Sequence, residues 1–73
     1  MTELIYKQIG LKVRSLRESL GISQQEIAKR CGLSRPTIVN FEAGRQRISL
    51  HELENIARAI GTTPKHIMKG IWL

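Results

Sequence analysis

The side chains best equipped for chemistry in this sequence are hydrogen-bonding and small apolar groups between positions 35 and 40. The guanidinium of Arg35 can donate two hydrogen bonds to guanine O6 and N7, and the Asn40 amide can pair with adenine or meet a phosphate. Thr37 offers a hydroxyl together with a methyl group that suits thymine. The candidates for contacts with base edges, should this segment lie on an exposed helix, are Arg35, Pro36, Thr37, Val39 and Asn40.

The charge balance of the chain independently favours an anionic partner. Twelve Lys and Arg residues against six Asp and Glu residues give a net charge of +6 on 73 residues, and the isoelectric point is about 10.3. An excess of this size favours nucleic acid, an acidic membrane surface or an acidic protein as the partner. The alternative interpretation is that the charge only keeps a small protein soluble.

Catalytic and metal-binding chemistry has little support in the sequence. His51 and His66 have no neighbouring nucleophile and do not show the HExxH spacing of a zinc site. The single cysteine, Cys31, excludes an internal disulfide and a cysteine-rich zinc site, and its place on an apolar helix face predicts a core residue. We therefore expect no enzymatic activity and no cofactor or metal, and, because the chain is too short for a separate effector domain, no small-molecule ligand.

Length and hydropathy limit the architecture and the compartment. Seventy-three residues suffice for one domain, so we predict a single domain over residues 1–73. No apolar run exceeds three residues, which excludes a segment that spans a membrane. The N-terminal residues lack the apolar stretch of a secretory signal, and we expect the chain in a reducing cytoplasm.

Apolar spacing and capping residues predict an all-α fold of short helices joined by turns that glycines mark. The first helix is expected over residues 3–19, with an apolar face formed by Ile9, Val13, Leu16 and Leu20. Capping boxes beginning at Ser23 and at Ser49 predict the starts of the second and the fourth helix. The fourth helix is expected to bury Leu50, Leu53, Ile56, Ala57 and Ile60.

Two prolines mark the starts of the remaining helices. Pro36 follows the capping residue Ser34, which predicts a third helix from Arg35 to about position 43. Pro64 follows Thr63 in the same way and predicts a short fifth helix before Gly70. The sequence therefore predicts five helices in all.

Residues 24–43 have the pattern of a helix-turn-helix motif. Two helices of about eight residues are joined by a short turn that contains Gly32, as a crossing of about 90–120° requires. Ala28 is small enough to let one helix axis approach the other, and the space between them would be filled by Ile27, Cys31, Leu33, Ile38 and Phe41. The alternative is an ordinary corner between two helices of a small bundle.

Residues 9–70 resemble the Cro/lambda-repressor type of helix-turn-helix domain, often called the XRE family. Residues 20–28 (LGISQQEIA) and residues 32–44 (GLSRPTIVNFEAG) carry most of the resemblance, together with the apolar pattern of residues 53–61. The resemblance implies a five-helix lambda-repressor-like bundle, a recognition helix in the major groove of DNA, and usually a homodimer on a near-palindromic operator. It also implies a partly buried ion pair between Arg17 and Glu42.

A second group of polar residues is expected to contact phosphates, which fix the register of a protein on DNA without reading its sequence. Gln24 begins the second helix, whose free amides and positive dipole end suit a phosphate, and the resemblance implies contact by its side chain as well. Arg45 and Arg47 lie in the loop where the family commonly holds the strand, the alternative being that both are only solvated. The predicted phosphate contacts are Gln24, Ser34, Arg45, Gln46 and Arg47.

The apolar C-terminal residues are open to two interpretations. Ile67 is expected in the core of the monomer. Ile71, Trp72 and Leu73 either cover the same core or form a dimer interface.

Together these features favour a homodimeric, sequence-specific regulator of transcription that binds double-stranded DNA, in the simplest case a repressor. An alternative is a protein-interaction module of the same fold, antitoxin-like or coactivator-like, in which the apolar C-terminal cluster holds a partner. Attachment to an acidic membrane through Lys7, Lys12 and Arg14 of the first helix is a weaker alternative, and we expect no membrane partner.

Overall fold

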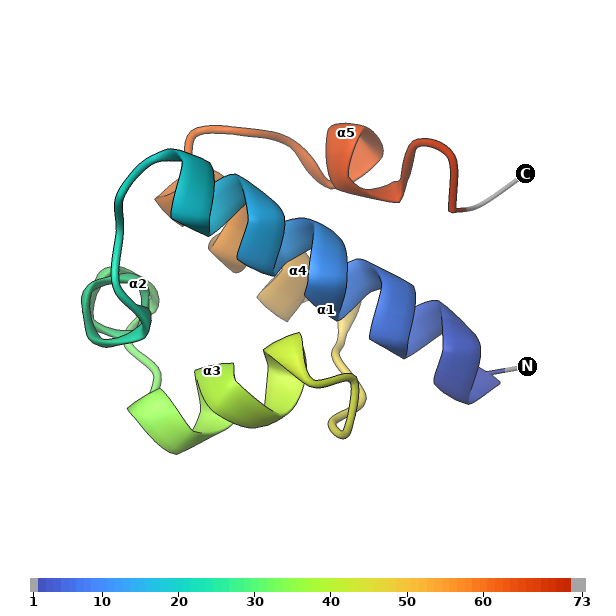
Figure 1. Ribbon diagram of the computed structural model, residues 1–73, viewed down its shortest axis with the longest axis horizontal. Coiled ribbons are helices and arrows are strands. Elements are labelled where there is room, and N and C mark those ends of the chain that lie inside the picture. Colours follow the sequence, from blue (N-terminus) through green and yellow to red (C-terminus); the bar gives the residue numbers. More distant parts are fainter. Residues whose placement is uncertain (1, 72–73) are drawn as a thin grey trace.

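Five α-helices form the part of the chain that the structure, a computed structural model, describes, residues 2–71 (Figure 1). They are α1 (Thr2–Ser19), α2 (Gln24–Cys31), α3 (Arg35–Glu42), α4 (Leu50–Ala59) and α5 (Pro64–Met68). Since these residues contain no strand, the predicted all-α fold is confirmed, and every helix begins within one residue of its predicted start. Within the same range no helix combines the length and the apolar character that a membrane crossing needs.

The starts of the later helices are set by side-chain caps, because the first amides of a helix have no partner within it. The hydroxyls of Ser34, Ser49 and Thr63 each accept a hydrogen bond from the amide three residues further on. The capping box predicted at Ser49 is complete, since the Ser49 amide donates to the Glu52 carboxylate at 3.0 Å. These local bonds explain why the predicted helix starts agree so closely with the structure.

The capping box predicted at Ser23 is only half formed. The Ser23 hydroxyl accepts a hydrogen bond from the Glu26 amide at 3.0 Å, as expected. The Glu26 carboxylate is used elsewhere, because its Oε2 atom accepts from Arg30 Nε at 3.0 Å. Arg30 also donates to the carbonyl of Ala59 at 3.2 Å, so this exposed pair links α2 to the end of α4.

All five helices contribute to one apolar core. Its buried side chains are Ile9, Val13, Ile27, Ala28, Cys31, Ile38, Phe41, Leu53, Ile56, Ala57, Ile60 and Ile67. In Figure 1, α1 crosses the molecule with α3 below it, α5 above it and α4 behind it, and α1 packs directly against both α3 and α5. The core therefore lies between α1 and the other helices.

Two leucines that the sequence places in the core are exposed. Leu20 is 55% exposed because α1 ends at Ser19, so that Leu20 leaves the apolar stripe, and Ile22 packs against the core after the turn. Leu50 is 85% exposed although it opens the amphipathic helix α4. It lies at the edge of that helix's buried face, where neither α1 nor α5 closes over it and a surface hollow remains between them.

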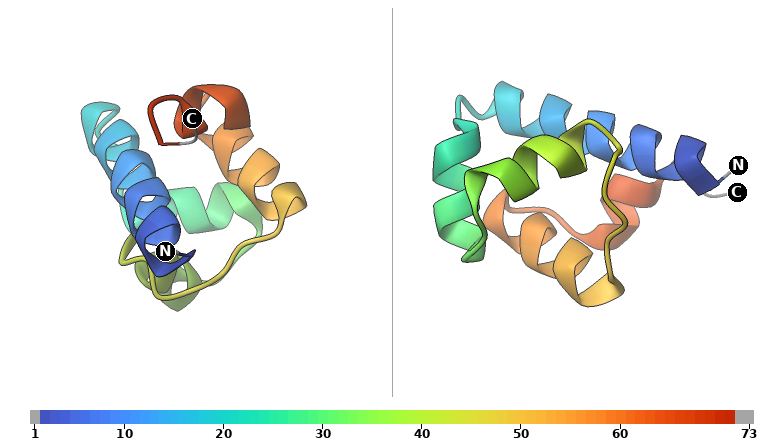
Figure 2. Two further views of the ribbon diagram at one scale, coloured as in Figure 1. Left: turned by 90° about the vertical axis from the view of Figure 1, so that its right-hand side faces the viewer. Right: turned by 90° about the horizontal axis from the view of Figure 1, so that it is seen from below.

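Helix α3 lies at the periphery of the bundle. Its inner side packs against α2 and α1. In the right-hand view of Figure 2 it runs along the near side of the molecule, and no other helix covers its outer side. This is the element on which the predicted base-contacting residues lie.

Candidate nucleic-acid interface

The turn between α2 and α3 fixes the crossing of the two helices. Gly32 adopts φ +70°, a left-handed conformation that favours glycine, and ends α2 there. The Leu33 amide then donates to the carbonyl of Ala28 at 2.9 Å, which folds the chain back against α2. Ala28 is buried, and its small side chain lets α3 approach, so the motif has the features expected from the sequence.

The inner face of the motif is apolar and closed. Ile27 and Ile38 have no exposed surface, and Phe41 is 3% exposed. Large apolar side chains that are buried this completely hold α3 in one orientation, because shifting the helix would open a cavity or expose them. The side chains on the opposite face of α3 are therefore presented at a fixed angle.

The five predicted base-contacting residues all lie on the outer side of α3. Arg35 and Pro36 are exposed in its first turn, and the side chains of the other three, Thr37, Val39 and Asn40, are half-buried. Thr37 is already engaged, since its Oγ1 lies 2.8 Å from the Ser34 hydroxyl that caps the helix. Its methyl group is uncommitted, and its hydroxyl, which has one donor and two acceptor lone pairs, keeps capacity for an additional contact.

The ion pair implied by the family resemblance lies at the junction of α1, α2 and α3. Arg17 Nε donates to Glu42 Oε2 at 2.7 Å and Nη2 donates to Oε1 at 3.1 Å. The two residues are only 8% and 4% exposed. The hydrogen bond to Glu42 raises the pKa of the Arg17 guanidinium above its ordinary value, although burial acts in the opposite direction. The guanidinium of Arg17 therefore keeps its charge.

Gln24 belongs to the same buried network. Its Nε2 donates to Glu42 Oε1 at 3.1 Å, so its side chain helps to hold the carboxylate of the last residue of α3. Arg17 Nη1 also donates to the carbonyl of Ile22 at 2.7 Å, which fixes the turn before α2. The predicted phosphate contact of Gln24 would therefore be made by a side chain that its hydrogen bond to Glu42 already orients.

A polar hollow opens beside this network at the start of α2. It is lined by Arg14, Arg17, Ser23, Gln24, Gln25 and Arg35. The sequence analysis names neither Arg14 nor Gln25 as a DNA contact, since it considers Arg14 only for the membrane alternative. The sequence does carry one signal for Arg14: it lies three residues, or about one helical turn, before Arg17 and therefore on the same face of α1. Arg14 is exposed and donates to Glu18 at 3.3 Å.

The loop after α3 brings further cationic side chains to the same side. Arg45 is exposed, and its Nε and Nη2 donate to Asn40 Oδ1 at 3.3 and 3.2 Å. Gln46 and Arg47 line a small hollow together with Thr37 of α3. The loop therefore lies beside the predicted base-reading face, whereas contact of its side chains with phosphates stays a prediction.

The three residues predicted as an alternative dimer interface are only partly described. Ile71 is half-buried and packs against the core. Trp72 and Leu73 lie outside the described residues. The described part contains no group of three or more His, Cys, Asp or Glu side chains that could hold a metal ion.

Comparison with known proteins identifies the family. The model of the helix-turn-helix family HTH_3 matches residues 13–67, which is most of the chain. The chain belongs to the HTH_3 family. Its named relatives and structural neighbours are transcriptional regulators and control proteins, so the chain is a helix-turn-helix transcriptional regulator, and the predicted lack of enzymatic activity is confirmed.

Three known proteins are similar to the chain over most of its length. The control protein C.BamHI of Bacillus amyloliquefaciens is 38% identical over 69 residues, which cover 93% of this chain and 85% of that protein. An uncharacterized HTH-type transcriptional regulator of Methanothermobacter thermautotrophicus is 45% identical over 49 residues, covering 67% and 71%. The crystal structure of the restriction-modification controller protein C.AhdI from Aeromonas hydrophila superposes with a TM-score of 0.82 at 29% identity, covering 85% and 94%.

Proposed function

We propose that the chain acts as a single domain over residues 1–73, a sequence-specific, homodimeric DNA-binding repressor in the cytoplasm. The observation that carries this proposal is the geometry of α3, whose inner side is fixed by buried Ile38 and Phe41 while its outer side is uncovered. The major groove of B-DNA is about 12 Å wide and admits one α-helix. Helix α3 would enter it with Arg35 foremost, since base contacts in this motif lie near the start of the recognition helix.

The contacts divide into two kinds. Arg35, Thr37 and Asn40 would read base edges, with apolar contacts from Pro36 and Val39. Ser34 and Gln24 at helix starts, and the loop residues Arg45, Gln46 and Arg47, would contact phosphates. The net charge of +6 supports the second kind, because each cation that neutralises a phosphate releases counterions.

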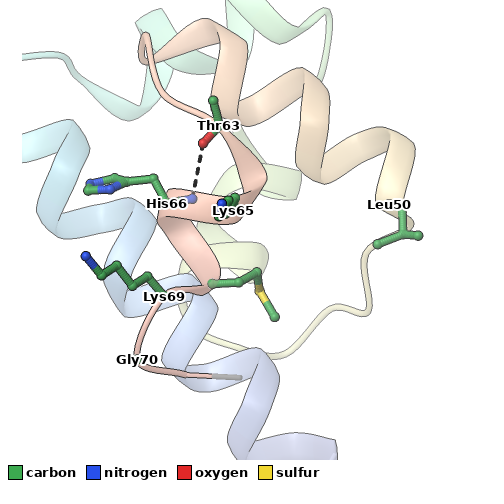
Figure 3. Close-up of a pocket in the computed structure, with 7 residues that line it drawn as sticks. Leu50, Thr63, Lys65, His66, Lys69 and Gly70 are labelled. Atoms are coloured by element: carbon green, nitrogen blue, oxygen red, sulfur yellow. Dashed lines mark hydrogen bonds between the residues drawn. The ribbon is translucent and has the colours of Figure 1, made fainter. Parts of the chain in front are cut away.

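The face around Leu50 supports a homodimer. Leu50 is 85% exposed beside a hollow whose lining includes Met68, Lys69 and Gly70 of the α5 region (Figure 3). A protruding apolar side chain and a hollow on one face fit a two-fold interface, since each copy could place its Leu50 in the hollow of the other. Ile71, Trp72 and Leu73, which follow Gly70 in the sequence, would extend this interface. Such a dimer would present its recognition helices about 34 Å apart, one turn of DNA.

The similarity to C.BamHI and C.AhdI favours a role in a restriction–modification system. The first is named a control protein and the second a restriction-modification controller protein. Regulation of such a system by this chain is therefore the specific biological role that we propose.

Selection of bound duplexes from a random pool tests the function. The proposal predicts a near-palindromic consensus whose half-sites are centred about one helical turn apart. A protein that selects no sequence at about 50 mM salt, a condition that favours DNA binding, yet captures a second protein stably, would instead be the interaction module. Binding to anionic vesicles but not to duplex DNA would identify the membrane alternative.

A further inference from the structure

Asn40 and Arg45 are joined by three hydrogen bonds at the end of α3. Arg45 Nε and Nη2 both donate to Asn40 Oδ1, at 3.3 and 3.2 Å. The Arg45 amide also donates to the Asn40 carbonyl at 2.9 Å. A residue assigned to base reading and a residue assigned to phosphate binding therefore form one unit.

The turn that carries Arg45 has little freedom to move. Gly44 ends α3 with φ +74°, and its amide donates to the carbonyl of Phe41 at 3.0 Å. A Cβ atom on Gly44 would lie 2.5 Å from the Cα of Lys7, so this turn is packed closely against the backbone of α1. The position of the Arg45 backbone relative to Asn40 is thus set by both helices.

The chemistry of the two side chains determines which half of the amide remains available. A guanidinium group has only donors, so the Asn40 atom that faces it is the carbonyl oxygen Oδ1. Within residues 2–71 the two N–H groups on Nδ2 have no partner, and they stay free to donate. The bidentate pairing of asparagine with adenine needs both halves, because Oδ1 must accept from N6 while Nδ2 donates to N7.

We propose that Arg45 is a positioning residue: it occupies the acceptor Oδ1 of Asn40, so that Asn40 contacts DNA bases only through the donors on its Nδ2. This inference rests on the proposed function. Asn40 then favours base edges that present an acceptor in the major groove, which are guanine O6 and N7, adenine N7 and thymine O4. It discriminates against cytosine, whose N4 is a donor, and has no special preference for adenine. Arg45 in this way sets the base preference at a position that it does not itself contact.

Arg47 provides a matched control in the same loop. It is exposed like Arg45 and carries the same charge. Within residues 2–71 its side chain makes no hydrogen bond to Asn40 or to any other residue of α3. Loss of Arg47 therefore removes a cation near the DNA without releasing the Asn40 amide.

The test measures binding of the full chain to its selected operator with each base pair replaced in turn, at one fixed salt concentration. The variants are Arg45→Ala, Arg45→Lys, Arg47→Ala, Asn40→Ala and the double variant Asn40→Ala/Arg45→Ala. The position read by Asn40 is the one whose base preference disappears in Asn40→Ala. At that position Arg45→Ala should raise the preference for adenine about fivefold or more, the low end of discrimination by a bidentate pair.

The other variants separate positioning from simple charge. Arg45→Lys should keep a profile close to wild type, since an ammonium can still donate to Oδ1. Arg47→Ala should weaken binding with an unchanged profile, and Arg45→Ala should change no base preference once Asn40 is absent. Uniform weakening by Arg45→Ala with an unchanged profile, or an Asn40→Ala variant that alters no position, would overturn the inference. A wild-type chain that selects no sequence contradicts the proposed function itself, and this is seen before any variant is compared.

Discussion

Arg17 and Glu42 form a bidentate ion pair that joins α1 to the last residue of α3, although 25 positions separate them in the sequence. The shorter of the two contacts is 2.7 Å, and both side chains are almost fully removed from solvent. Gln24 from α2 donates to the same carboxylate. The Glu42 carboxylate therefore connects α1, α2 and α3. The orientation of α3 therefore depends on a polar contact as well as on the apolar core.

Replacement of Arg17 by Met should destabilise the fold strongly. The Glu42 carboxylate would stay buried with Gln24 as its remaining side-chain partner, and an unpaired buried charge costs about 3–5 kcal/mol. Urea denaturation followed by circular dichroism measures the loss. Replacing both partners, as in Arg17→Met/Glu42→Leu, should recover a large part of it.

Arg14→Met is the matched control for the buried pair. Arg14 pairs with Glu18 on the surface of the same helix, and its side chain is 56% exposed. An exposed pair contributes about 0–1 kcal/mol, so this variant should unfold close to the wild-type midpoint. Equal losses in Arg14→Met and Arg17→Met would show that burial of the ion pair is irrelevant to stability.

Gly10→Ala should destabilise the protein even though alanine favours helix formation. A Cβ atom at position 10 would lie 2.4 Å from the carbonyl oxygen of Phe41 and 2.6 Å from that of Glu42, and both are backbone atoms of α3. Moving α1 away from α3 should cost about 1–3 kcal/mol, more than the gain of about 1 kcal/mol in helix propensity. Ser15→Ala, on the exposed side of α1, is the control. A melting temperature of Gly10→Ala at or above that of wild type would contradict this close approach.

Much of the fold follows from local sequence signals. The caps at Ser34 and Ser49 act within one turn of helix, so the amino acids around them suffice to predict where α3 and α4 begin. Gly32 and Ala28 likewise predict the turn and the close helix crossing. These features need no information from distant parts of the chain.

The features that could not be predicted depend on distant neighbours or on a choice between partners. Leu50 fits the apolar pattern of α4, but its burial depends on whether α1 and α5 extend over it. Glu26 could accept from its capping residue or from Arg30, and periodicity does not decide between them. The contact of Arg45 with Asn40 is apparent only once the turn at Gly44 is known.

Leu50→Lys should weaken self-association and leave the monomer intact. An apolar side chain that is 85% exposed contributes little to the core, so the stability should change by no more than about 0.5 kcal/mol. Burial of a leucine in an interface contributes about 1.5–3 kcal/mol, so the dimer dissociation constant should rise tenfold or more. Sedimentation equilibrium measures this constant. Leu11→Lys, at a leucine of α1 that is 55% exposed, should leave it unchanged, and equal effects of the two variants would place the interface elsewhere.

The stability of the fold should decrease at alkaline pH because of Cys31. Burial raises the pKa of the Cys31 thiol above its ordinary value. As the pH rises through about 8.5, the unfolded chain loses this proton first, so the folded state binds more protons and becomes less stable by at most about 1.4 kcal/mol per pH unit. Urea midpoints at pH 7.5 and about 9.5 should therefore diverge more in wild type than in Cys31→Ala. The same pH slope in both proteins would show that the thiol does not contribute.

The most direct test of the account compares Arg35→Ala with Arg47→Ala on the selected operator and on a random duplex, at several salt concentrations. Arg35→Ala should lose about 1–3 kcal/mol of binding on the operator and little on random DNA, because its guanidinium reads a base. Arg47→Ala should weaken both complexes alike. It should also reduce the slope of the logarithm of the binding constant against the logarithm of the salt concentration, by about the amount that one phosphate contact contributes. If Arg35→Ala instead weakens both complexes equally, α3 does not read sequence through its exposed N-terminal end, and the central claim is wrong.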